Sequence, residues 1–88
     1  MKRYFLSYNG LTKEYYLDYG CFDRQRQFLG KADKEKLVKK LVEILPMQRS
    51  ITIYAQKDLD DSLKSFLLNN FKNTRVNVQF EKNLESLC

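Results

Sequence analysis

Apolar and polar side chains alternate along the first part of the chain, and this period of two predicts a β-strand. One side of the strand collects Tyr4, Leu6 and Tyr8. Asn9-Gly10 follows, and both residues tolerate the positive φ that a two-residue type I′ hairpin turn needs. Such a loop pairs Tyr8 with Leu11 and places Leu11 on the apolar face of a second strand. A longer loop is the alternative.

Residues 24–29 have the weakest periodicity in the chain, because Arg24 and Arg26 share a side with Phe28. We interpret this segment as a third strand, which completes an antiparallel meander and is ended by Gly30. Basic side chains suit a strand at the edge of a sheet, where charge deters pairing with other chains.

The clearest helix is predicted over residues 33–45, with Asp33 capping its first turn. An apolar stripe recurs at helical spacing on one face and contains Leu37, Val38, Leu41, Val42, Ile44 and Leu45. The opposite face carries Lys36, Lys39 and Lys40. Pro46 ends the helix, because the residue before a proline is pushed out of the α region.

The rest of the chain alternates strand, helix and strand. Residues 51–55 are β-branched and aromatic, which suits a central strand buried on both faces and parallel to a neighbour. We expect Asp58 to cap a second helix and Asn73 to end it in a left-handed conformation. Residues 75–80 alternate and predict a last strand, with Val76, Val78 and Phe80 pointing inward. Residues 81–88 are expected to form one helical turn over an end of the sheet.

These elements predict a single α/β (α+β) domain over residues 1–88. A three-strand antiparallel meander is followed by α-β-α-β, which gives a mixed five-stranded sheet covered by two helices. This element order resembles that of ribonuclease H-like domains, and the resemblance covers about the whole chain. It is a resemblance of fold, and function has to be argued from the site. A ferredoxin-like arrangement is the alternative if residues 24–29 are not a strand.

Ribonuclease H-like enzymes hold two metal ions with carboxylates, one of which comes from the first strand. Residues 1–10 contain no acid at all. Asp58 lies near the place where another carboxylate of that family would fall, but a helix cap also explains it. Without an acid on the first strand, two-metal catalysis lacks its clamp, and we expect no metal site.

Other catalytic and cofactor sites also lack their usual residues. The chain has no His, which removes the commonest general base and zinc ligand. No glycine-rich motif that cradles phosphate is present. Cys21 and Cys88 are the only cysteines, and we expect both to be reduced. The sequence therefore predicts no enzyme and no cofactor. It contains neither a signal peptide nor a membrane span, so we expect a cytoplasmic protein without a membrane partner.

Positive charge is concentrated in one part of the chain. Residues 24–40 contain seven basic residues and two acidic ones, a surplus equal to the net charge of +5 of the whole chain. This asymmetry favours an acidic partner, either nucleic acid or an acidic protein surface. The candidate binding residues are Arg24, Arg26, Lys31, Lys36, Lys39 and Lys40. Tyr16 and Phe5, if exposed, are candidates for stacking on bases.

The sequence thus favours a small non-enzymatic protein that contacts nucleic acid through residues 24–40. The alternative is a protein-interaction module or an inhibitor, of the anti-defence kind encoded by phages or mobile elements, that occludes a partner protein. Tyrosine and arginine are enriched in such interfaces. An unpaired first or last strand also allows a homodimer to form by pairing of sheet edges.

Overall fold

Strand β1 (Lys2–Asn9) lies at the centre of a five-stranded sheet with the strand order β3-β2-β1-β4-β5. In the computed structural model, which describes residues 2–87, β1 pairs antiparallel with β2 (Glu14–Tyr19) and β2 pairs antiparallel with β3 (Gln27–Gly30). β4 (Ile51–Gln56) runs parallel to β1, and β5 (Val76–Glu81) runs parallel to β4. The predicted meander followed by α-β-α-β is confirmed. Because β3 forms, the ferredoxin-like alternative is not adopted.

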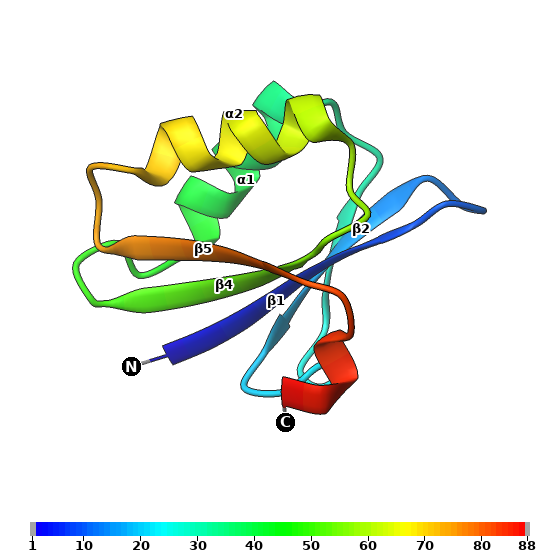
Figure 1. The fold of residues 1–88 in the computed structure, drawn as a ribbon, viewed down its shortest axis with the longest axis horizontal. Coiled ribbons are helices and arrows are strands. Elements are labelled where there is room, and N and C mark those ends of the chain that lie inside the picture. The colour runs from blue at the N-terminus through cyan, green and yellow to red at the C-terminus, as the bar shows by residue number, and fades with distance from the viewer. Residues whose placement is uncertain (1, 88) are drawn as a thin grey trace.

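The two long helices cover the same face of this sheet. Figure 1 shows α1 (Lys34–Ile44) and α2 (Asp61–Phe71) together on one side, with the 3₁₀ turn η1 (Leu84–Leu87) on the other side. The central place of β1 leaves the first strand without a free edge, so only β3 and β5 are edge strands. The expectation that the first strand could pair across a dimer is therefore wrong, because β2 and β4 already occupy both edges of β1.

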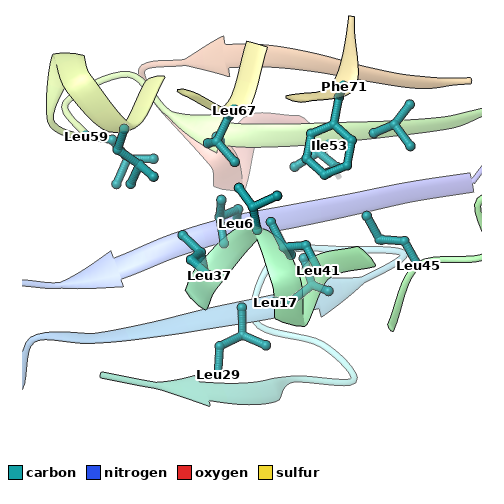
Figure 2. Close-up of a cluster of buried hydrophobic side chains, with 14 of the residues drawn as sticks. Leu6, Leu17, Leu29, Leu37, Leu41, Leu45, Ile53, Leu59, Leu67 and Phe71 are labelled. Carbon is teal, nitrogen blue, oxygen red and sulfur yellow. The ribbon is translucent and has the colours of Figure 1, made fainter. Parts of the chain in front are cut away.

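The hydrophobic core fills the space between the two helices and the sheet (Figure 2). Its central members are fully buried and come from β1, α1, β4 and α2: Leu6, Leu37, Leu41, Ile53 and Leu67. β4 lies between two parallel neighbours, as its β-branched and aromatic sequence predicts. On β5, Val76 is buried, and Val78 and Phe80 pack against the core as expected.

The helix ends follow local capping chemistry, with two differences from the sequence prediction. Asp33 caps α1 as expected, because its Oδ1 accepts a hydrogen bond from the backbone N–H of Lys36 at 2.9 Å. α2 is capped by Asp60 rather than Asp58, since β4 extends to Gln56 and a turn intervenes before the helix. Asn73 does not adopt a left-handed conformation. Instead, the Thr74 hydroxyl donates to the Phe71 carbonyl at 2.7 Å.

The β1–β2 hairpin has a four-residue loop, so the two-residue turn predicted from Asn9-Gly10 is wrong. Asn9 pairs with Glu14. The Asn9 side-chain oxygen accepts a hydrogen bond from the backbone N–H of Leu11 at 2.9 Å. The Asn9 backbone carbonyl accepts one from the backbone N–H of Lys13 at 2.7 Å. The register moves by an even number of residues, so the other strand residues keep their predicted faces. Leu11 does not, because it lies in the loop with 95% of its surface exposed.

β3 is shorter than predicted and begins at Gln27 rather than Arg24. The preceding residues form a loop in which Asp23 and Gln25 have positive φ values of 64° and 44°. Left-handed backbone at these two non-glycine residues turns the chain out of the extended conformation, so the regular strand begins only after them. The directions of Arg24 and Arg26 are therefore set by the loop conformation and not by the alternation of a strand.

Leu41→Ala should destabilise the fold strongly, because this fully buried side chain sits at the centre of the core. We expect a loss of about 2–5 kcal/mol in the free energy of unfolding, measured by urea denaturation. The matched control is Val42→Ala on the same helix. Val42 was assigned to the apolar stripe, but it is 47% exposed, and its truncation should change the free energy by less than about 0.5 kcal/mol. Equal losses would contradict the described packing of α1.

Candidate nucleic-acid interface

The six basic residues singled out from the sequence do not form one patch. α1 packs on the sheet face that carries Leu17 and Leu29. Asp18 follows Leu17 along β2 and so points to the opposite face, where Arg26 binds it. Arg26 and α1 thus lie on different sides of the sheet. The exposed Arg24 belongs to the same loop as Arg26, whereas Lys31, Lys36, Lys39 and Lys40 follow β3 or lie on α1.

Arg26 is held in place by a buried carboxylate. Its Nε and Nη2 donate to the two oxygens of Asp18 at 2.8 and 2.9 Å, and Asp18 has no exposed surface. Asp18 also accepts from the backbone N–H of Asp23 at 2.6 Å. The hydrogen bonds to Asp18 raise the pKa of the Arg26 guanidinium above its ordinary value. Arg26 therefore ties the loop after β2 to the sheet, and most of its charge is already neutralised.

Lys40 also makes an internal contact. Its Nζ donates to the carbonyl of Leu29 at 2.6 Å, which joins α1 to the edge strand β3. This contact shows that the lysine side of α1 borders β3. Lys36 and Lys39 share this side of the helix and are exposed.

Three lysines from separate segments surround one open depression beside β3. Lys13 comes from the hairpin loop, Lys31 from the connection after β3, and Lys36 from the first turns of α1. The depression measures about 490 Å³ and is also lined by Tyr8, Tyr15, Ala32 and Asp33. We call Lys13, Lys31 and Lys36 the basic edge. All three side chains are exposed.

Lys13 is the member of the basic edge that the sequence prediction missed. A two-residue turn would have placed it within the second strand, whereas the four-residue loop leaves it outside β2, as the last residue of the loop. Tyr15 pairs with Gly30, so the hairpin loop and the end of β3 lie at the same end of the sheet. The predicted meander already implies this proximity. Its first and third strands run in the same direction, so both finish at the same end of the sheet.

Two tyrosines, Tyr8 and Tyr15, line the depression. The rings of Tyr8 and Tyr15 pack with centroids 4.7 Å apart and planes inclined by 45°. Burial raises the pKa of the Tyr15 hydroxyl above its ordinary value, with smaller contributions from Tyr8 and from the negative charge of Asp60. Asp33, which lines the depression, and Asp60 both accept backbone hydrogen bonds as helix N-caps.

On the sheet face opposite the helices, the structure differs from the expectation that Phe5 and Tyr16 stack on bases. Phe5 has no exposed surface and packs on Tyr54 with ring centroids 5.5 Å apart, so it cannot stack on a base. Tyr16 is half-buried beneath the Arg26 guanidinium, which lies 4.7 Å from the ring centroid. The exposed aromatic residue on this face is Phe28, at 71%. Weak alternation in residues 24–29 hid its direction from the sequence analysis.

The other features of residues 2–87 that bear on function are metal ligands, membrane-spanning helices and cysteines. No three acidic or cysteine side chains in this range gather closely enough to hold a metal ion. None of the helices in the same range combines the length and the apolar character needed to span a membrane. Cys21 is half-buried, and Cys88 falls outside the residues that the structure describes.

Comparison with known proteins returned no matching family model, curated protein or solved structure.

Arg26→Met should destabilise the protein because it leaves the buried Asp18 carboxylate without its cation. We expect a loss of about 2–4 kcal/mol in the free energy of unfolding, toward the lower part of the range for a broken buried pair because Arg26 is 26% exposed. Arg24→Met, two residues away at an exposed position, is the matched control and should be nearly neutral. Urea denaturation of both variants measures the difference, and equal stabilities would contradict a structural role for Arg26.

The raised pKa of Tyr15 should make the fold lose stability in alkali. The unfolded chain ionises at the ordinary tyrosine pKa, before folded Tyr15 does, so the contribution is complete below about pH 10 and is lost as the pH rises through the folded pKa. Tyr15→Phe should therefore lose less stability than the parent protein between about pH 9 and pH 11. Tyr54→Phe on the opposite face controls for the removal of one hydroxyl. Parallel pH profiles of the parent and Tyr15→Phe would contradict this interpretation.

Proposed function

We propose that this protein binds the phosphate backbone of nucleic acid through the basic edge and has no catalytic activity of its own. The observation that carries the proposal is the convergence of three exposed lysines from separate segments around one depression. Lysines scattered for solubility would be distributed over the whole surface. Three that meet at one place create a local positive potential, which attracts a polyanion.

The charges near the basic edge support this proposal. Asp33 lines the same depression, but its carboxylate accepts the backbone N–H of Lys36. Lys39 extends the positive surface along the outer side of α1, three residues after Lys36. Flexible lysine side chains neutralise phosphates without reading bases, so the expected binding is independent of sequence and sensitive to salt.

The remaining basic residues of the segment have supporting roles in this proposal. Arg26 fixes the loop after β2, and Lys40 fixes α1 against β3. Lys40 still has donors to spare beyond its single bond to Leu29, so it can add to the potential of the basic edge. Arg24 lies in the loop before β3, whereas Lys31 follows β3, so the length of this strand separates Arg24 from the basic edge.

Charge reversal at the basic edge should abolish most of the binding. We expect Lys13→Glu/Lys31→Glu/Lys36→Glu to lose affinity for a fluorescently labelled oligonucleotide, measured by anisotropy at about 50 and 200 mM salt. For a single strand, the slope of log K against log salt should become shallower by about 2, corresponding to three lost phosphate contacts. The oligonucleotide should remain intact in Mg²⁺ and Mn²⁺, as expected of a binding protein without catalysis.

A control with the same change of net charge isolates the effect of position. Arg49, Lys72 and Lys82 are exposed and lie outside the basic edge, so Arg49→Glu/Lys72→Glu/Lys82→Glu should retain most of the affinity. Equal losses in both triple variants would show that only overall charge matters. Absence of oligonucleotide binding by the parent protein at about 50 mM salt would overturn the proposal.

A protein-interaction module or inhibitor is the second candidate, and one observation favours it. Leu11 at the tip of the hairpin is 95% exposed, and a large apolar side chain in that position suits insertion into a pocket of a partner. This candidate predicts a parent protein that binds no oligonucleotide. The anisotropy measurement above therefore decides between the two.

A further inference from the structure

Phe28 projects from the edge strand β3 on the sheet face opposite the helices. Four large apolar residues are exposed in the described part of the chain, namely Leu11, Phe28, Val42 and Leu68. Phe28 is the only aromatic residue among these four. A single exposed apolar side chain is common and carries no conclusion by itself. The surroundings of the ring make this position different from the other three.

The Phe28 ring rests on a rigid support. It meets the Tyr16 ring edge-on, with centroids 5.3 Å apart and planes inclined by 83°. The Arg26 guanidinium lies over the same Tyr16 ring and is fixed by its two bonds to Asp18. The support of the ring is thus anchored to a fully buried carboxylate. A ring held in this way loses little side-chain freedom on contact with a ligand.

The charges around Phe28 fit a polyanion that carries aromatic groups. Arg26 is neutralised by Asp18 and by Asp23, whose carboxylate lies 3.3 Å from its Nη1, so Arg26 does not attract a phosphate. The exposed Arg24 precedes β3 and the exposed Lys31 follows it. Positive side chains therefore flank the ring along the edge of the sheet, and Lys31 connects this stretch with the basic edge.

We infer that Phe28 stacks on an unpaired base, so that the protein prefers single-stranded nucleic acid to a duplex. This inference rests on the proposed function. Phosphates on either side of the stacked base would face Arg24 and Lys31. Stacking of bases on exposed aromatic rings within a basic groove is the usual way in which proteins hold single strands without reading their sequence. A duplex offers no free base face at this position until a base leaves the stack.

A tryptophan at this position reports stacking directly, because the chain contains no Trp. The Phe28→Trp variant is titrated with a single-stranded oligothymidylate of about 12 nucleotides, with a duplex of the same length and with inorganic polyphosphate. We expect the single strand to quench the indole emission and polyphosphate, which carries no bases, to leave it unchanged. Leu68→Trp is the control, since Leu68 lines a depression beside β5 at the other margin of the sheet. Its emission should not respond.

Affinity provides the second readout. Phe28→Ala should weaken binding of the single strand by about 5- to 150-fold, the loss expected for one stacked base, and leave the salt slope unchanged. Duplex affinity should stay the same, and Leu68→Ala should bind like the parent protein. Because Phe28 is mostly exposed, thermal melting of Phe28→Ala should match that of the parent.

The outcomes separate this inference from the proposed function. If the parent protein binds the single strand, but Phe28→Ala binds equally well and Phe28→Trp emission does not change, stacking is wrong and the phosphate site stands. Equal affinities of the parent for the single strand and the duplex would also overturn the inference. If the parent binds neither nucleic acid, the proposed function falls together with the inference.

Discussion

The structure depends on covering a single apolar face of the sheet. Leu6, Leu17 and Ile53 present this face, and α1 and α2 are the only long elements in residues 2–87 that can bury it. Both helices pack on the same side of the sheet (Figure 1), so their polar faces turn away from it. Among the lysines of α1, Lys40 reaches β3, where its Nζ donates to the Leu29 carbonyl. The placement of the basic edge is thus a consequence of the core. Burial of the apolar stripe sets the rotation of the helix, and this rotation decides which lysines border the edge strand.

A buried ion pair organises the other face. Asp18 lies where a β-strand residue must face away from the helices, and its carboxylate has no access to water. A buried carboxylate is costly unless it is paired and hydrogen-bonded, and Arg26 with the backbone N–H of Asp23 supplies this pairing. The loop between β2 and β3 is therefore drawn over the open face, which also positions the Tyr16 ring under the guanidinium. The Tyr16 ring that supports Phe28 is therefore held in place because the buried Asp18 carboxylate requires Arg26 as its partner.

The candidate site was only partly visible in the sequence. Lys31 and Lys36 were named and lie at the basic edge, because the helix period and its cap determine the exposed side of α1. Arg26 was named for its charge, but a buried acid eight residues earlier in the chain occupies it. Lys13 was missed because the Asn9 side chain accepts loop amides and so favours a longer turn over the type I′ turn that Asn9-Gly10 usually indicates. Phe28 was missed because the weak alternation of residues 24–29 did not indicate which side of this strand is exposed.

Local chemistry in the sequence determined the kinds of element and their order. The period of two in residues 2–8, the helical stripe of residues 33–45 and the Asp33 cap act between neighbours in the chain, so they can be recognised without a fold. Tertiary structure alone decided which basic residues meet. Arg26 and Lys36 belong to the same basic segment, yet strand pairing and burial place them on opposite sides of the sheet. Lys13 and Lys31 are distant in sequence, yet the antiparallel meander brings them to the same end. The position of a charged residue in the sequence does not determine which face of the sheet it occupies. Hydrogen bonding between strands and burial of the core decide this.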